Sequence, residues 1–533
     1  MIKNKLLLFL IIVSLILPHI AFAEDVQSQV IEASADTYIV NSDRCRSLNY
    51  GSSSTMLFGS VYQRTAMLRF DLNGIDLSAY KGALLEVYVA SEQTDVSMYV
   101  YSTDSEWSEN TLTWNNANYP MNFQASVPIS ETGIKKYKIS LNKAFEEAKN
   151  SDSKVLSLSF SSDAKCLNAY SSEYHKQTMR PKLILTEPEA FVIGQIDVQY
   201  TRPTPQQIAS DIRENLATKT HPYIYASKED FEEIKEYGFG KDEFLIKTYS
   251  GIKKKADEYL TLDVLDYGNE GLDITKSERI LSTAVNAIER ISFLATVYHV
   301  ENNLQYAERA WKELDHLVSQ NHWTHTLLDN SSACVAASIG YDWLYDYLGK
   351  ERREKVVAAI KSKSLDIITD IYTNPDLYST WRNPTGTTQT GAVFNPMNHS
   401  SHNNSHFIVG ALAVADTDPD YSAYIVSNAL SAAEPMMNVL NPDGGCYEGT
   451  GYWGYIGSKF GMAFGAMHSA LGTMYGYDKV PGIAKTGYFP IYMQSSYGNM
   501  VYNDMYNNVK TSDEEIFFLA MMSGDKALQK LCV

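Results

Sequence analysis

The hydrophobic pattern divides the chain into a β-rich N-terminal part and a helical C-terminal part. Residues 30–187 contain short runs of β-branched and aromatic residues, separated by clusters of Gly, Ser and Asn. This pattern is typical of a β-sandwich. The runs that predict strands most clearly are 66–71, 84–89, 136–141, 156–160 and 182–185. We therefore expect an all-β, jelly-roll-like sandwich over residues 24–187.

From about His221 the apolar residues recur at steps of three and four, which predicts helices. The strongest helical patterns cover residues 280–298, 304–318, 333–348 and 352–372. Many of these helices are apolar around their circumference, as expected for helices packed between neighbours. The predicted fold class is multidomain, with an all-α domain of about eight to ten helices over residues 221–533.

The segment between these two parts, residues 188–220, is polar and contains Pro188, Pro203 and Pro205. We expect it to be a linker, because proline disfavours both helix interiors and central strands.

The first 23 residues read as a signal peptide. Lys3 and Lys5 precede an apolar run at 6–17, and Ala21-Phe22-Ala23 supplies small residues for cleavage. No later apolar run reaches the length needed to span a bilayer. We therefore expect a secreted or extracellular protein that begins near Glu24.

The formal net charge of −18 argues against nucleic acid and anionic membrane surfaces as partners. An anionic polysaccharide fits this charge only if a few Arg and Lys residues set the local field. Of the five cysteines, Cys45 and Cys166 fall in the β-rich part and could form a disulfide. Cys334, Cys446 and Cys532 show no metal-ligand spacing.

Two polar clusters carry most of the candidate chemistry. Residues 395–406 are rich in Asn, Ser and His, and residues 441–455 are rich in Gly and Tyr. Apolar helical runs at 407–415 and 421–440 separate them, and consecutive antiparallel helices bring such ends together. Asn, His and Tyr can polarise a carboxylate, accept a carbon-bound proton and protonate a leaving oxygen.

The N-terminal part resembles the DNRLRE-type carbohydrate-binding modules of secreted bacterial polysaccharide-degrading proteins, which implies a glycan-binding domain. The matching motifs are Ala35-Asp36-Thr37-Tyr38, Asn49-Tyr50-Gly51, Leu68-Arg69-Phe70-Asp71, and Trp107 with Thr113-Trp114-Asn115-Asn116. We expect the two tryptophans to fill the sandwich core rather than to contact sugar.

The helical part resembles the α/α toroid of the heparinase II/III-like and alginate-lyase families. The matching motifs, in family order, are His221-Pro222-Tyr223-Ile224, the segment 337–346, Asn398-His399, the segment 410–416, Pro442-Asp443-Gly444-Gly445, Glu448-Gly449 and Tyr452-Trp453-Gly454-Tyr455. The resemblance implies β-elimination in a uronate-containing acidic polysaccharide, without a cofactor. Such lyases usually carry a C-terminal β-sandwich, and no β-rich stretch follows the helical pattern here. We therefore expect a toroid that is incomplete at its C-terminus.

The resemblance also implies catalytic roles. Asn398 and His399 would share the charge of the substrate carboxylate, and His399 could also act as a base. Either Tyr452 or Tyr455, three residues apart on one helix face, would transfer a proton. Tyr447 is a third possibility for that role.

Five further residues are candidates for substrate binding: Arg382, Asn383, His402, Glu448 and Trp453. A positive charge such as Arg382 would help a tyrosine to act as a base, because the unperturbed pKa of tyrosine is about 10. Glu448 could instead cap a helix, and Trp453 could instead pack in the core.

A metal site is not expected. His399, His402 and His406 step by three and four, which suits zinc on a helix, but the intervening Ser and Asn residues favour turns.

Two other functions remain open from sequence. One is a non-catalytic glycan-binding protein. The other is a glycoside hydrolase on the same helical scaffold, which would pair Glu448 with an unidentified aspartate. An unsaturated product that absorbs in the ultraviolet would distinguish elimination from both.

Overall fold

The fold is described from a computed structural model. It describes residues 28–117, 121–192, 195, 200–267, 277–323, 326–375, 389–495, 498–500, 519–520 and 524–531. The expected signal peptide and the candidate residues Arg382 and Asn383 lie outside these ranges.

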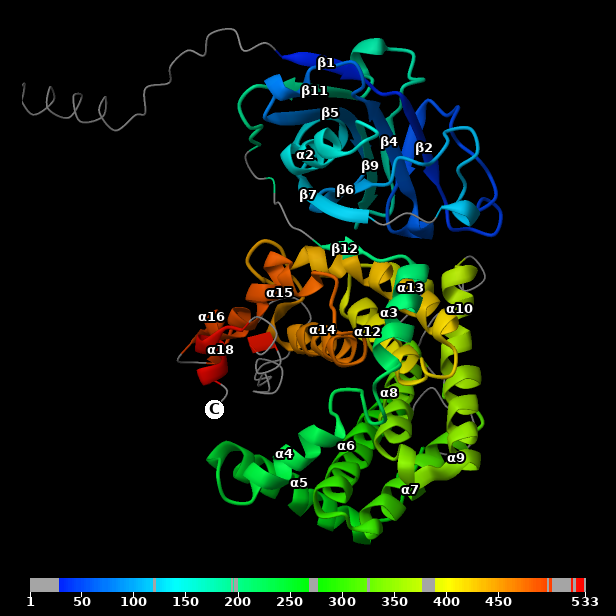
Figure 1. Ribbon diagram of the computed structural model, residues 1–533, viewed down its shortest axis with the longest axis vertical. Coiled ribbons are helices and arrows are strands. Elements are labelled where there is room, and N and C mark those ends of the chain that lie inside the picture. Colours follow the sequence, from blue (N-terminus) through cyan, green and yellow to red (C-terminus); the bar gives the residue numbers. More distant parts are fainter. Residues whose placement is uncertain are drawn as a thin grey trace, which may run out of the picture.

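The N-terminal domain is a sandwich of two six-stranded sheets, as the alternating pattern predicts (Figure 1). One sheet has the order β1-β11-β5-β10-β3, with β8 also paired to β5, and the other has the order β12-β7-β6-β9-β4-β2. The strands are β1 (Gln29–Glu32), β2 (Ala35–Ile39), β3 (Thr55–Phe58), β4 (Thr65–Asp71), β5 (Gly82–Ser91), β6 (Val96–Thr103), β7 (Met121–Ile129), β8 (Gly133–Ser140), β9 (Val155–Ser162), β10 (Leu167–Tyr170), β11 (Lys182–Thr186) and β12 (Thr201–Arg202).

Alternation along the strands explains the sandwich core. In β5, Leu85, Val87 and Val89 are buried, while the residues between them are only half-buried. Trp107 is also buried, and its Nε1 donates a hydrogen bond to Ser157 at 2.9 Å. The expectation that Trp107 fills the core is therefore confirmed.

Trp114 is half-buried, so its ring is only partly covered. Cys45 and Cys166 are both free thiols, so the disulfide considered from sequence is not formed in the structure.

The C-terminal domain is helical. Its helices curve away from the sandwich, from α12, α13 and α14 beneath it to α4 and α5 at the far end (Figure 1). The helices are α3 (Pro205–Leu216), α4 (Lys228–Gly238), α5 (Glu243–Thr261), α6 (Ser277–Glu301), α7 (Leu304–Val318), α8 (Leu327–Trp343), α9 (Tyr345–Ile360), α10 (Asp366–Thr373), α11 (Gln389–Phe394), α12 (Asn398–Ala413), α13 (Pro419–Val439), α14 (Gly449–Leu471), α15 (Pro481–Lys485), α16 (Phe489–Tyr492) and α18 (Lys526–Leu531).

The described residues from 221 onward form fourteen α-helices, more than the eight to ten expected. Several of these are only one or two turns long. The pattern at 352–372 also spans two helices, because a π-helical segment at Lys361–Leu365 separates α9 from α10. No helix in the described part of the chain is long and apolar enough to cross a membrane.

Helices α8 and α12 form the centre of the helical domain. Almost every residue of both is buried, and they pack against each other. Gly410 makes this contact possible, because a Cβ at that position would lie 2.4 Å from the Sγ of Cys334. Neighbours surround α8 and α12, which explains why their sequences show little amphipathic character.

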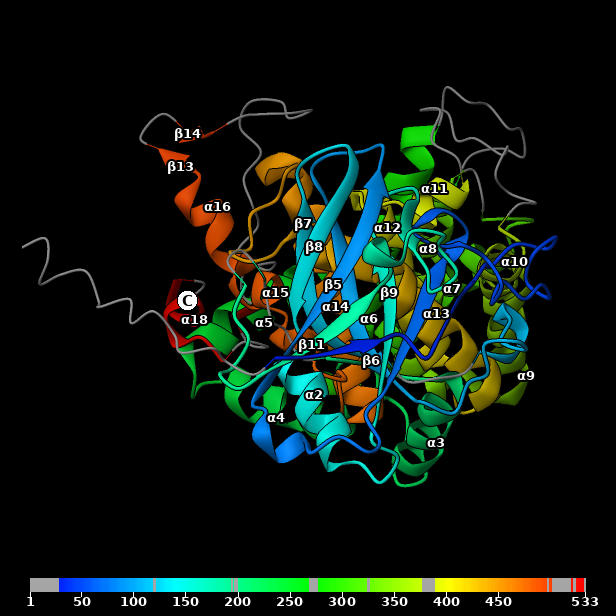
Figure 2. The same ribbon diagram turned by 90° about the horizontal axis from the view of Figure 1, so that it is seen from above.

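The segment 188–220 is more than a linker. Strand β12 pairs with β7 of the sandwich, and α3 packs against α13 and α14. Viewed from the sandwich end, the strands lie over these helices (Figure 2). The described part of this segment therefore contacts both domains.

A buried carboxylate lies at this junction. Glu434 on α13 is 1% exposed and accepts hydrogen bonds from Arg202 Nε at 2.9 Å and from the Tyr101 hydroxyl at 2.8 Å. The Tyr477 hydroxyl also donates to it. One side chain thus binds the sandwich, the connecting segment and two parts of the helical domain.

We expect Glu434→Gln to lower the free energy of unfolding by about 3–5 kcal/mol, because it leaves the Arg202 guanidinium without its buried partner. Urea titration followed by fluorescence measures this loss. Asp420→Asn is the matched control, because it breaks the exposed Arg213–Asp420 pair and should cost less than about 1 kcal/mol. Equal losses in the two variants would contradict the assignment.

Candidate active site

The first polar cluster is helical rather than a turn. Helix α12 begins at Asn398, and its residues from Ser400 onward are buried. Ser400 Oγ and Asn404 Nδ2 both donate to the Val393 carbonyl of α11, at 2.9 and 2.8 Å. Asn403 Nδ2 donates to the Ala392 carbonyl at 3.2 Å. These tertiary bonds give Ser400, Asn403 and Asn404 partners inside a helix, which the expected turn did not foresee.

Glu448 connects the two polar clusters. Its carboxylate accepts the Asn398 backbone N–H at 2.8 Å and the Asn398 side-chain Nδ2 at 2.5 Å. Glu448 occupies the N-cap position of α14 but makes no side-chain capping bond to that helix, and it is 8% exposed. The beginnings of α12 and α14 therefore lie against each other, and these two helices pack along their length.

His399 follows directly on α12 and is half-buried. No described residue lies within hydrogen-bonding distance of its buried Nδ1. Burial lowers the pKa of His399 below its usual value of 6.5. The imidazole is therefore neutral near pH 7, and its Nδ1 is shielded from solvent.

Three tyrosines, at positions 447, 452 and 455, lie just before or within the first two turns of α14. The rings of Tyr452 and Tyr455 are 6.4 Å apart between centroids, and Tyr455 is 52% exposed. Tyr447 instead donates its hydroxyl hydrogen to the Pro396 carbonyl, and burial and the Glu448 charge raise its pKa. Tyr447 thus holds the loop before α12 against the loop before α14, which leaves Tyr452 and Tyr455 as candidates for proton transfer.

Two predicted substrate-binding residues are corrected. His402 is 2% exposed and bonds through Nε2 to Ser332 Oγ at 3.1 Å. Trp453 is fully buried and donates from Nε1 to Thr486 Oγ1 at 2.7 Å. Both side chains point into the packed interior of the helical domain, where a polysaccharide does not reach.

The three histidines of α12 do lie on one helix, contrary to the turn argument. Even so, no metal-ligating group that includes them is found among the described residues. The one group with suitable spacing in the described ranges consists of Asp36, Glu109 and Glu173 in the sandwich. Burial raises the pKa of Asp36 to about 7, and its carboxylate already accepts the Ser172 N–H at 2.7 Å.

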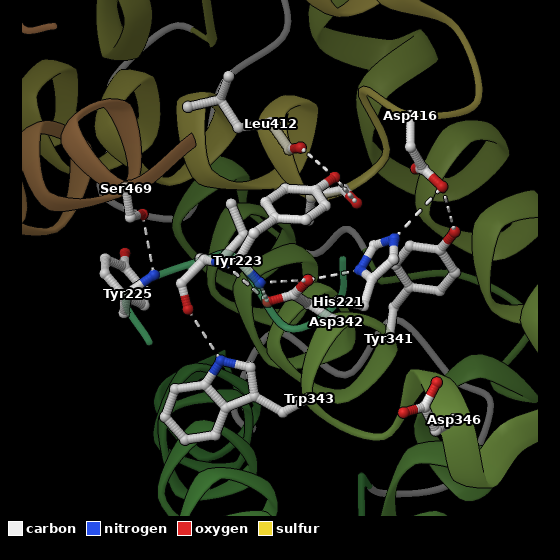
Figure 3. Close-up of polar contacts among 12 residues, drawn as sticks. His221, Tyr223, Tyr225, Tyr341, Asp342, Trp343, Asp346, Leu412, Asp416 and Ser469 are labelled. Atoms are coloured by element: carbon white, nitrogen blue, oxygen red, sulfur yellow. Dashed lines mark hydrogen bonds and ion pairs between the residues drawn. The ribbon is translucent and has the colours of Figure 1, made fainter. Parts of the chain in front are cut away.

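A second polar network was not predicted from sequence (Figure 3). His221 Nδ1 lies 2.6 Å from Asp342, and its Nε2 lies 3.3 Å from Asp416. The buried Asp342 carboxylate also accepts the backbone N–H groups of Tyr223 and Ile224. Burial opposes protonation of His221, but the two carboxylates outweigh it and raise its pKa.

This network lies far from the junction of α12 and α14. The Tyr223 hydroxyl donates to the Leu412 carbonyl at the end of α12, whereas Asn398 begins that 16-residue helix. At 1.5 Å per residue the two ends are about 22 Å apart. The motifs at 221–224 and 337–346 were visible in the sequence, but their contact was not.

Comparison with known proteins identifies one domain. Residues 27–187 match the model of carbohydrate-binding module family 96. This match agrees with the predicted glycan-binding sandwich. No curated protein matches the chain.

One similar solved structure is the crystal structure of a family 76 glycoside hydrolase from a bovine Bacteroides thetaiotaomicron strain. It shares 10% sequence identity over 90% of this chain and 98% of its own, with a TM-score of 0.30. Likeness at that level decides nothing about the reaction. The domain that the comparisons identify is therefore the sandwich, which is similar to a carbohydrate-binding module.

Proposed function

We propose that the protein is a secreted enzyme that binds an acidic, uronate-containing polysaccharide and cleaves it by β-elimination where α12 meets α14. The observation that supports this most is the Asn398–Glu448 pair, which fixes an amide beside the neutral imidazole of His399. The family 96 match of the sandwich supports a polysaccharide partner.

Elimination requires the carbon-5 proton of a uronate to leave while the adjacent carboxylate is ionised. Negative charge then develops on that carboxylate, and neighbouring donors stabilise it. Asn398 Nδ2 carries two hydrogens and gives one to Glu448, so the other can bind the substrate carboxylate. Glu448 therefore acts as a positioning residue, because it sets the direction of the amide.

Proton transfer falls to His399 and to Tyr452 or Tyr455. Neutral His399 can accept the carbon-5 proton, and a tyrosine hydroxyl can protonate the leaving oxygen at carbon 4. The carbon–oxygen bond breaks as a double bond forms between carbons 4 and 5. No water is consumed, and the product gains an unsaturated uronate.

Hydrolysis is the second candidate reaction. The observation that favours it is Glu448, a nearly buried carboxylate at the same junction. Hydrolysis requires two acids separated by roughly 5–9.5 Å across the scissile bond. Both Glu448 oxygens already accept hydrogen bonds from Asn398, which suits an orienting role better than an acid–base one.

We expect His399→Ala, and one of Tyr452→Phe and Tyr455→Phe, to slow turnover by roughly 10²- to 10⁴-fold, the usual scale for a lost proton-transfer group. The assay follows the ultraviolet absorbance of the unsaturated product on a panel of uronate polymers. Tyr237→Phe on α4 is the control and should leave the rate unchanged.

Other outcomes would contradict parts of this proposal. Full activity in both tyrosine variants would contradict the proton-transfer assignment. Saturated products would indicate hydrolysis. Binding without any product from the wild-type protein would indicate a non-catalytic glycan-binding protein.

The pH dependence tests His399 as the base. A base works when it is deprotonated, so kcat/KM should fall as the pH falls through the lowered pKa of His399. We therefore expect the acidic limb of the profile to lie below pH 6.5. A limb above pH 6.5, measured over pH 4.5–9 at constant ionic strength, would show that another group is the base.

A further inference from the structure

A cavity of about 450 Å³ lies between the sandwich and the helical domain. Strands β2 and β4 line one wall, and α13 with the last residue of α11, Phe394, lines the other. Its volume falls in the range of pockets that hold small ligands, roughly 300–1,000 Å³. The cavity exists only while the two domains are docked, so neither domain forms it alone.

The charge of this cavity is opposite to that of the protein. Within the described part of the chain its lining includes Arg46, Arg64 and Arg202, with no aspartate or glutamate. The whole chain carries a net charge of −18. A concave site lined by one sign of charge concentrates ligands of the opposite sign. The lining therefore favours an anion, although the net charge of the protein is negative.

The three arginines are not equally neutralised. Glu434 balances Arg202 through its buried ion pair. Arg46 lies 3.7 Å from the exposed Asp43 and donates to Asn41 Oδ1 at 2.8 Å. The buried Nε of Arg46 has no acceptor among the described residues.

Arg64 forms no ion pair with a carboxylate of the described residues. Its guanidinium sits 5.1 Å from the centroid of the Tyr62 ring and hydrogen-bonds the uncharged Cys166 side chain. The planar fork of an arginine matches the two oxygens of a carboxylate. Arg64, helped by Arg46, thus supplies an unbalanced positive charge to the cavity.

The rest of the lining suits a sugar. Half-buried Trp114 offers part of an indole surface, and sugar rings pack well on such amphipathic aromatic groups. A capping box between Thr113 and Asn116 fixes the turn that carries Trp114. Asn115 and Gln63 add amide groups to the same walls.

We propose that this cavity, defined by Arg46, Arg64 and Trp114 on the sandwich and by α13 opposite, binds a short anionic oligosaccharide. Arg64 and Arg46 bind its carboxylate or sulfate groups, and Trp114 packs against a sugar ring. This site is separate from the junction of α12 and α14. The inference does not depend on catalysis, because binding alone defines it.

The cavity lies close to the segment that leads into the candidate active site. Phe394 ends α11, and the chain then runs through residues 395–397 to Asn398. A polysaccharide held in the cavity therefore lies next to the loop that leads into the candidate active site. The cavity would retain the polymer beside the residues proposed to cleave it.

Isothermal titration of the full chain tests this proposal. The titrations use the His399→Ala background, so that little ligand is consumed during the measurement. The probes are di- and trisaccharides of mannuronate, guluronate, galacturonate and glucuronate, sulfated disaccharides, neutral oligosaccharides of equal length, and inorganic sulfate. We expect at least one anionic oligosaccharide to bind, neutral ones to bind at least tenfold more weakly, and added salt to weaken binding.

Variants locate the binding. Arg64→Gln should weaken it at least tenfold, Arg64→Lys should restore part of it, and Trp114→Leu should weaken it as well. The matched control is Arg213→Gln, which removes an exposed arginine on α3 and should bind like the parent. Unchanged thermal unfolding midpoints show that each variant folds.

Several results would overturn the proposal. They are unchanged binding in Arg64→Gln and Trp114→Leu, equal binding of neutral oligosaccharides, binding of inorganic sulfate alone, and no binding of any oligosaccharide at millimolar concentration. Comparing the titrations of the uronate oligosaccharides with those of the sulfated disaccharides shows which of the two classes of sugar binds. A negative result in these titrations does not affect the elimination assay, because that assay follows product formation rather than binding to this cavity.

Discussion

The arrangement of the domains depends on the hydrogen bonds and the ion pair that the Glu434 carboxylate forms. A buried charge is costly unless it is paired and hydrogen-bonded, and Glu434 meets both conditions only when the domains are docked. Arg202 comes from the connecting segment, Tyr101 from the sandwich and Tyr477 from beyond α14. Separating the domains would expose or unpair all of these groups at once. The inter-domain cavity exists because this contact holds its two walls in place.

The same principle operates in α12, with a different result. Its buried Ser and Asn side chains find acceptors on α11, and the helix tolerates them there. The histidines of this helix differ, because His399, His402 and His406 each keep a buried ring nitrogen with no partner among the described residues. Next to His399, Glu448 holds the side-chain amide of Asn398 in place.

The sequence predicted elements whose pattern is local. The helix at 304–318 has one apolar face, and α7 covers the same residues. Five predicted strands correspond to β4, β5, β8, β9 and β11. The prediction failed where tertiary contacts determine the local structure. The polar start of α12 is helical because α11 supplies hydrogen-bond acceptors. Trp453 and His402 are buried because of packing that no local pattern encodes. The pairing of Asn398 with Glu448 also depended on how two distant helices pack.

The docked sandwich has a consequence for how a long polymer would be processed. A binding module on a flexible tether raises the local concentration of its partner over a wide radius, set by the length of the tether. Here β12 pairs with the module and α3 packs against the helices, so the module cannot move over a wide radius. The module would instead hold the polymer at a fixed distance from the site of cleavage. The number of sugar units between a held residue and a cut bond would be fixed by the protein, and fragments would be released in characteristic lengths rather than at random.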